Sequence, residues 1–305
     1  MEELADGVSR QDHREEEAPI TRYPDFLPTL STTEQSLLSL GTKGAPGLDT
    51  ISGRLLRLFS AGFVPILHPL QLKCNLSIAA PFQWSGGALS KVPKGCGLHQ
   101  DCNSSRQVLV CDHAGKAPRK LLRDHLVCAF DGVAPDSFAG CPKGRGTDTA
   151  SHTIRAHLLW LKQHNHSGGV LFADIATAYY AVIKELGTGL SGAWGQRKVA
   201  RIFEYTGCGP ECFHEFLRLL DTPAQGNAGV SRHLTTMVTR LQENTWSVMQ
   251  GSDKVAVNAT GTRPGDPLAE VLFAFMYQNR IGAAVERFRK MGLFPHHEAG
   301  IARPV

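Results

Sequence analysis

The sequence lacks long apolar runs and the common short signatures of nucleotide-binding enzymes and hydrolases. No stretch approaches the roughly 18 consecutive apolar residues that a membrane-spanning helix needs. The glycine-rich P-loop is missing, because Gly115-Lys116 has no upstream glycine at the required spacing. No GxGxxG follows an expected strand, and the segment GLSGA lacks the last glycine of a nucleophile elbow. These absences argue against a P-loop enzyme and an α/β-hydrolase.

The chain also lacks a secretory signal, although it contains eight cysteines. Reduced thiols in an intracellular compartment are therefore expected, with nucleus and cytoplasm left open. Two short Cys/His clusters suggest zinc, but neither has a second ligand pair at zinc-finger spacing. The alternatives are structural zinc and incidental thiols, and the spacing favours thiols. The clusters are Cys96, His99 and Cys102, and Cys208, Cys212 and His214.

Charge is unevenly distributed along a chain of ordinary globular composition, with 42% hydrophobic and 20% charged residues and a formal net charge of +4. The first 17 residues hold seven acids and two arginines, so residues 1–30 are expected to form a disordered acidic tail. A basic band lies between Trp84 and His125. Such a band suits a phosphate-binding surface, although charge alone favours a solvated helix face. Its cations are Lys91, Lys94, Arg106, Lys116, Arg119, Lys120 and Arg123.

Apolar periodicity predicts helices and short strands without a regular βαβ rhythm, which favours an α+β fold. Ser31 and Glu34 form an expected capping box before a short helix. Strands are expected at 88–93 and 106–112, and a hairpin at 246–258 around Gly251-Ser252-Asp253. Further helices are expected at 51–62, 64–78, 115–130, 151–164, 196–205, 211–221 and 230–244, and from 266 onward.

The stretch GGVLFADIATAYYAVIKELG, residues 168–187, predicts a buried strand at 169–174 that ends on Asp174. Two roles are open for this carboxylate. It can cap the helix that follows, or it can bind a divalent metal, since hard oxygen ligands suit Mg²⁺. From this stretch alone, the helix cap is favoured.

Six blocks, read in order, resemble the reverse transcriptases of non-LTR retrotransposons and group II introns. The resemblance covers about residues 40–290, and the last two blocks are its most specific part. It implies a right-hand polymerase fold, with fingers at 31–165 and a partial palm at 166–305 whose helices pack on a small antiparallel sheet. The blocks are KGAPGLD, W…LSKVPKG, SRQVLV…GK…LL, GRGTDTA, FADIATAYY and GTRPGDPLAEVLF.

The resemblance also implies roles for particular residues in RNA-templated DNA synthesis by two-metal nucleotidyl transfer. Asp174 and the carbonyl of Ile175 would hold Mg²⁺ or Mn²⁺, and Tyr179 would exclude ribonucleotides. Lys94 and Arg106 would bind the deoxynucleoside triphosphate, since a guanidinium meets phosphate oxygens bidentately. Gly265 would let the backbone approach the nascent base pair. An RNA template and a DNA primer would contact Lys91, Lys116, Arg119, Lys120 and Arg123.

The sequence departs from the family pattern at three places. Pro264 stands where many relatives carry a glutamine, and Gln107 replaces a proline. The family's aromatic-x-Asp-Asp hairpin is not found, because no Asp-Asp pair occurs and Asp266 is the last aspartate. We therefore expect an incomplete and inactive polymerase fragment. The alternatives are a non-catalytic nucleic-acid-binding remnant and a structural protein that binds a metal or a partner.

Overall fold

The structure is a computed structural model that describes most of residues 26–292. The expected acidic tail lies almost entirely outside this range. The gaps within it are 95–104, 136–137, 142–143, 173, 176–177, 182, 189–195, 205, 222, 250 and 259–260. No helix in the described ranges is long and apolar enough to cross a membrane.

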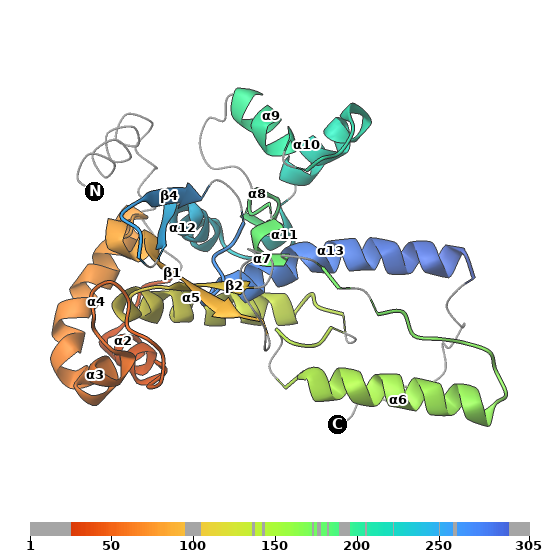
Figure 1. Ribbon diagram of the computed structural model, residues 1–305, viewed down its shortest axis with the longest axis horizontal. Coiled ribbons are helices and arrows are strands. Elements are labelled where there is room, and N and C mark those ends of the chain that lie inside the picture. The colour runs from red at the N-terminus through yellow and green to blue at the C-terminus, as the bar shows by residue number, and fades with distance from the viewer. Residues whose placement is uncertain are drawn as a thin grey trace.

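A small four-stranded sheet lies at the centre of the fold, in the order β2-β1-β3-β4 (Figure 1). The strands are β1 Gly86–Pro93, β2 Ser105–Val110, β3 Thr245–Met249 and β4 Val255–Asn258. β1 pairs antiparallel with β2, and β3 pairs antiparallel with β4. β1 and β3 are parallel, so the sheet is mixed, and the expectation of a purely antiparallel sheet is wrong. The chain between β1 and β3 contains many helices, which is the kind of long crossover that parallel pairing requires.

Helices surround the sheet and form most of the described chain (Figure 1). A group of three, α2, α3 and α4, packs at one end of the long α5, while α12 and α13 pack against its other half. Helix α6 and the far half of α13 extend away from the sheet. The longer helices are α2 Leu30–Leu38, α3 Gly53–Leu58, α4 Ser60–Ser77, α5 His113–Asp131, α6 Thr147–Gln163, α9 Gln196–Glu204, α10 Phe213–Asp221, α12 Arg232–Gln242 and α13 Ala269–Lys290. The shorter ones are α7 Ala178–Ala181, α8 Glu185–Thr188 and α11 Ala224–Asn227, with 3-10 turns at Phe82–Ser85 and Pro210–Cys212.

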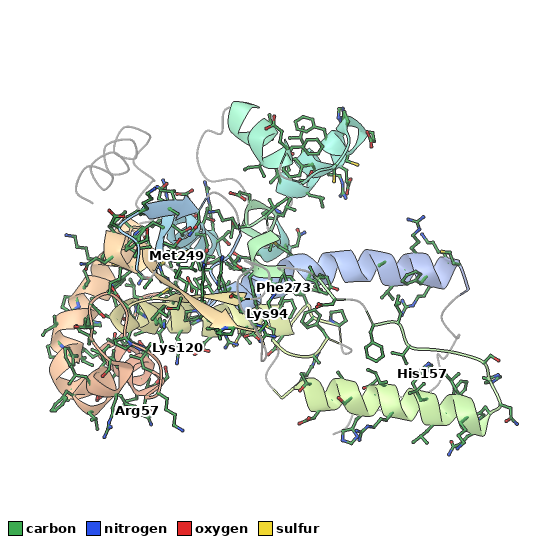
Figure 2. The ribbon with its side chains drawn as sticks, viewed as in Figure 1. Arg57, Lys94, Lys120, His157, Met249 and Phe273 are labelled. Atoms are coloured by element: carbon green, nitrogen blue, oxygen red, sulfur yellow. The ribbon has the colours of Figure 1, made fainter. Side chains whose placement is uncertain are left out.

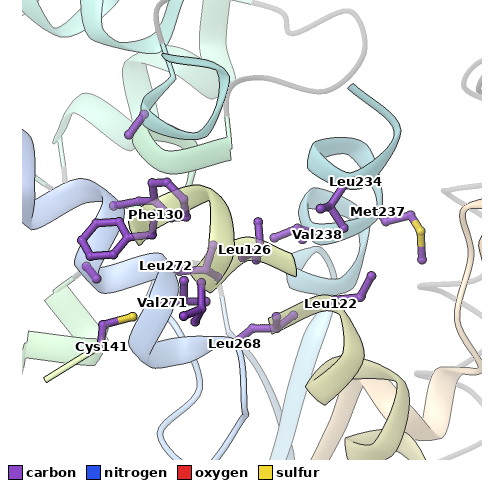
Figure 3. Close-up of a cluster of buried hydrophobic side chains, with 14 of the residues drawn as sticks. Leu122, Leu126, Phe130, Cys141, Leu234, Met237, Val238, Leu268, Val271 and Leu272 are labelled. Atoms are coloured by element: carbon purple, nitrogen blue, oxygen red, sulfur yellow. The ribbon is translucent and has the colours of Figure 1, made fainter. Parts of the chain in front are cut away.

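The main hydrophobic core lies between α5, α12 and α13 (Figure 3). Helix α5 contributes Leu126 and Phe130, which recur on one face as an amphipathic helix requires. Val238 of α12 and Leu272 of α13 meet them, and all four side chains are 0–1% exposed. This packing fixes α13 against α5 and so positions the turn that precedes α13.

Three local expectations are corrected by the structure. Thr29 and Thr32 form the capping box of α2, two residues before the expected Ser31–Glu34 pair, because α2 begins directly after Pro28-Thr29. Helix α6 begins at Thr147 rather than 151. The expected strand at 169–174 is absent from the described residues of that segment. Leu171 and Phe172 are 82% and 79% exposed, and without a partner strand an apolar run does not become a strand.

Candidate nucleic-acid interface

The turn at Thr262–Asp266 contacts segments that are far away in the sequence. Thr262 donates from its N–H and from its hydroxyl to the carbonyl oxygen of Tyr179, at 2.7 and 3.3 Å. Leu109 of β2 donates its N–H to the carbonyl oxygen of Pro264 at 2.9 Å. Three of the blocks named above, SRQVLV, FADIATAYY and GTRPGDPLAEVLF, therefore meet at this turn.

Gly265 is required at this turn by its backbone geometry. Its φ is +104°, and an added Cβ would lie 2.4 Å from the carbonyl oxygen of Leu109. No other residue type fits such an approach without moving the backbone. The resemblance implied a close approach to a base pair, whereas the approach in this structure is to β2.

A buried group of charges lies beneath the turn. Asp266, Arg119 and Arg263 have side chains that are 0%, 1% and 3% exposed. The Asp266 carboxylate accepts from Arg263 Nη2, lies 3.7 Å from Arg119 Nε, and accepts the N–H of Leu268 at 3.0 Å. Arg119 Nη2 and Arg263 Nη1 both donate to the carbonyl oxygen of Trp84. These bonds connect α5, the start of α13 and the chain before β1.

The pKa values in this group follow from burial and from the two positive charges. Burial raises the pKa of the Asp266 carboxyl, but the guanidinium groups of Arg263 and Arg119 outweigh it, so that the pKa lies below its ordinary value. Burial, with the like charge of Arg263, lowers the pKa of Arg119 to about 10. Asp266 is therefore an ionised counter-charge inside the protein.

The cations of α5 are largely engaged within the protein. Arg119 is buried, so the expectation that it contacts nucleic acid is wrong, because its guanidinium pairs with Asp266. Lys120 donates to the carbonyl oxygen of Ser39 at the end of α2. Arg123 forms an ion pair with Glu270 of α13 at 2.9 Å. These side chains join α5 to α2 and to α13.

The cations of the β1–β2 ribbon are exposed. Lys91 and Lys94 lie on and just after β1, and Arg106 lies on β2. Val92 pairs with Arg106 while Lys91 pairs with Gln107, so Lys91 and Arg106 lie on opposite faces of the ribbon. Figure 2 shows Lys94 in the central part of the molecule and Lys120 nearer to the α2–α4 end. Lys116 of α5 is half-buried.

The loop of the block KGAPGLD packs against the start of α5. The N–H of Asp49 donates to Asp112 Oδ1 at 3.3 Å, and His113 Nε2 lies 3.2 Å from the carbonyl oxygen of Ala45. An added Cβ on Gly47 would lie 2.1 Å from Asp112 Oδ1, so this loop too needs a glycine at the contact. The block KGAPGLD therefore meets the block SRQVLV…GK…LL here.

Asp174 and Ile175 lie in an irregular segment and are both exposed. Asp174 is therefore not at the end of a buried strand. It is also not next to the first residue of α7, which begins at Ala178. Its role as a metal ligand stays a prediction.

Tyr179 is partly buried on α7 beside α13. Its ring packs edge-on against Phe273, with centroids 5.9 Å apart. Burial raises the pKa of its hydroxyl, and the negative charges of Glu270 and Cys141 raise that pKa by a smaller amount. The residue is 37% exposed, so part of it is accessible to solvent.

Metal-binding groups of three or more His, Cys, Asp or Glu side chains are not found in the described part of the chain. Cys208, Cys212 and His214 are exposed there. Cys96, His99 and Cys102 lie outside the described residues.

Sequence reasoning missed Arg263 as a part of this region. Arg263 and Asp266 are three residues apart in a turn before a helix, a spacing that allows an ion pair, but nothing local indicates that both are buried. Comparison with known proteins adds no relative: no protein-family model matches the chain, and no curated protein matches it.

Proposed function

We propose that this chain is a reverse-transcriptase-like domain that binds a primer–template of RNA and DNA through its β1–β2 ribbon. One observation carries the proposal. Five of the six blocks that resemble the reverse-transcriptase pattern contact one another around Trp84, the start of α5 and the Thr262–Asp266 turn. Residues that form one functional centre are brought together by the fold in this way, although they are distant in sequence.

The exposed cations of the ribbon suit contact with phosphates. Arg106 offers a planar fork of donors, and Lys91 and Lys94 offer compact charges on flexible stems. Tyr179, with its ring held by Phe273, would pack against the sugar of an incoming nucleotide. Because Lys120 and Arg123 are bound to other parts of the protein, we assign them a smaller share of the binding.

Catalysis would require Mg²⁺ or Mn²⁺ held by several carboxylates. The described donors at the expected place are the exposed carboxylate of Asp174 and the carbonyl of Ile175, and no further acidic groups gather with them in the described ranges. This donor set does not fit two metal ions, which favours a second candidate function: a nucleic-acid-binding remnant without chemistry.

A binding titration at several salt concentrations tests the proposal. If Lys94 and Arg106 contact phosphates, the double variant Lys94→Ala/Arg106→Ala should flatten the dependence of log affinity on log salt by about 0.7–0.9 per lost contact. Arg54→Ala/Arg57→Ala is the matched control, since these arginines are exposed on α3, where Arg57 lies at the far end of the molecule (Figure 2). Equal slopes in both variants, or no binding at low salt, would contradict the proposal.

A primer-extension assay on the same protein separates the two candidate functions. Binding without extension in Mg²⁺ or Mn²⁺ supports the non-catalytic alternative. Templated extension that Asp174→Asn abolishes supports the polymerase, and it would assign the metal-ligand role to Asp174.

A further inference from the structure

Two histidines and a tryptophan form a compact group at the end of α6, away from the region described above. The indole of Trp160 stacks with the imidazole of His164 at a centroid separation of 4.7 Å and with that of His166 at 5.2 Å. The two imidazoles are 6.3 Å apart and within 7° of parallel. Stacked rings are separated by about 3.5 Å, so imidazoles on opposite faces of one indole would be at least about 7 Å apart. Both imidazoles therefore lie on the same face of Trp160.

The end of the helix holds these rings in position. Asn165 has a φ of +52°, and the N–H of His166 donates to the carbonyl oxygen of Leu161 at 2.9 Å, while that of Asn165 donates to Lys162 at 3.4 Å. This pair of hydrogen bonds is the Schellman motif, and asparagine is one of the residues that tolerate its left-handed position. The chain then turns back closely, because an added Cβ on Gly168 would lie 2.8 Å from the side chain of Leu161.

The hydrogen bond of His164 sets the chemistry of its ring. His164 Nδ1 lies 2.9 Å from the carbonyl oxygen of Trp160, and a carbonyl can only accept, so Nδ1 carries the hydrogen. In the neutral ring, Nε2 then has a free lone pair. Metal-binding histidines typically have this arrangement, in which one nitrogen donates to a carbonyl and the other binds the metal.

We propose that His164 and His166 bind one divalent transition-metal ion on the face of Trp160. Imidazole nitrogen suits Zn²⁺, Ni²⁺ and Cu²⁺, whereas Mg²⁺ prefers oxygen ligands. With metal–nitrogen bonds of about 2.1 Å, two imidazoles that share an ion have centroids at most about 6.5 Å apart. The observed 6.3 Å is within this limit, and a shift of about 1 Å by the exposed His166 gives a tetrahedral angle. Water completes the coordination shell.

Calorimetric titration of Zn²⁺ or Ni²⁺ into the whole chain tests this site. The chain has 13 histidines and eight cysteines, and other side chains among them can also bind metal. The test is therefore the difference in metal binding between the native protein and each variant, not the total amount of metal bound. His164→Gln and His166→Gln should each lose one micromolar binding event or weaken it at least tenfold. His157→Gln is the matched control, a half-buried histidine two turns earlier on the same helix (Figure 2), and it should keep that event.

The tryptophan gives a second, local measurement. Cu²⁺ or Ni²⁺ bound on the indole face should quench Trp160 fluorescence, and Trp160→Phe should lose this quenching step while keeping the binding. A thousandfold excess of Mg²⁺ should displace nothing. The proposal is overturned by unchanged binding in both histidine variants, by binding only at millimolar metal, or by equal loss in His157→Gln. Melting curves of the variants confirm that they remain folded.

Discussion

Asp266 is the residue on which the buried charge group depends. Its carboxylate is the counter-charge of both Arg119 and Arg263, and all three side chains are almost completely excluded from water. A buried ion pair contributes little net stability relative to an apolar replacement, but removal of one partner leaves an uncompensated charge. The charge group therefore acts mainly to specify how Trp84, α5 and α13 meet.

We expect Asp266→Asn to lower the free energy of unfolding by about 3–5 kcal/mol at pH 7. The pKa of Asp266 is lowered in the folded state, so its contribution is present above the unfolded pKa of about 3.9 and is lost as the pH falls through the lower folded pKa. Urea denaturation between pH 7 and pH 2.5 should show this acid-dependent loss in the native protein and a smaller one in the variant. Glu286→Gln, at an exposed ion pair of α13, is the control and should change stability by less than about 0.5 kcal/mol.

At the scale of elements, the turn before α13 is where β2, α7 and the buried charges are joined. In this turn Gly265 has a positive φ, and its backbone also lies close to the carbonyl oxygen of Leu109. The cost of the positive φ can be measured separately at another glycine that has no such contact. Gly265 and Gly251 have φ values of +104° and +83°, but only Gly265 has an atom within 4 Å of an added Cβ.

Gly251→Ala should therefore cost only the backbone strain of the left-handed region, about 1–2 kcal/mol. Gly265→Ala adds a collision with the carbonyl oxygen of Leu109, so the β2 contact must open, and we expect at least twice the loss. Thermal unfolding of the two variants measures the difference. Equal melting temperatures would mean that the turn moves away from β2 at no cost.

At the scale of the whole molecule, the apolar side chains form separate clusters rather than one core. The main cluster joins α5, α12 and α13, a second lies within α2–α5, and a third joins α9 and α10. The third contains Val199, Ile202, Phe216 and Leu220, and among the described residues its partly buried members beyond α9 and α10 are Ile183 and Leu186. The α9–α10 pair should therefore unfold without the rest of the molecule.

Hydrogen exchange of two core variants tests this independence. Phe216→Ala should increase exchange in α9 and α10 while the amides of α5 and α12 stay protected. Leu272→Ala, in the main core, should lower the protection of α5, α12 and α13 together. It should also cost about 2–5 kcal/mol of global stability. Loss of α5 protection in Phe216→Ala would show that the clusters unfold as one unit.

Local pattern by itself determined the elements whose stability is mostly local. Periodicity and turn residues predicted helix α5, strands β1 and β2 and the β3–β4 hairpin close to where they lie. The reason is that apolar side chains on one face of a helix or a strand recur at the spacing of that element. The α+β class followed from their order. The mixed character of the sheet did not, because β1 and β3 are separated by more than 150 residues and their direction depends on the helices between them.

Only the tertiary structure decided which charged and apolar residues face water. Arg119 and Lys91 belong to the same basic band in the sequence, yet one is buried against Asp266 and the other is exposed on β1, because burial depends on a partner 147 residues away. Residues 169–174 have the composition of a strand, but a strand forms only where a neighbouring strand accepts its hydrogen bonds. The sequence carries the local preferences of each segment, and the contacts between distant segments determine which of those preferences is realised.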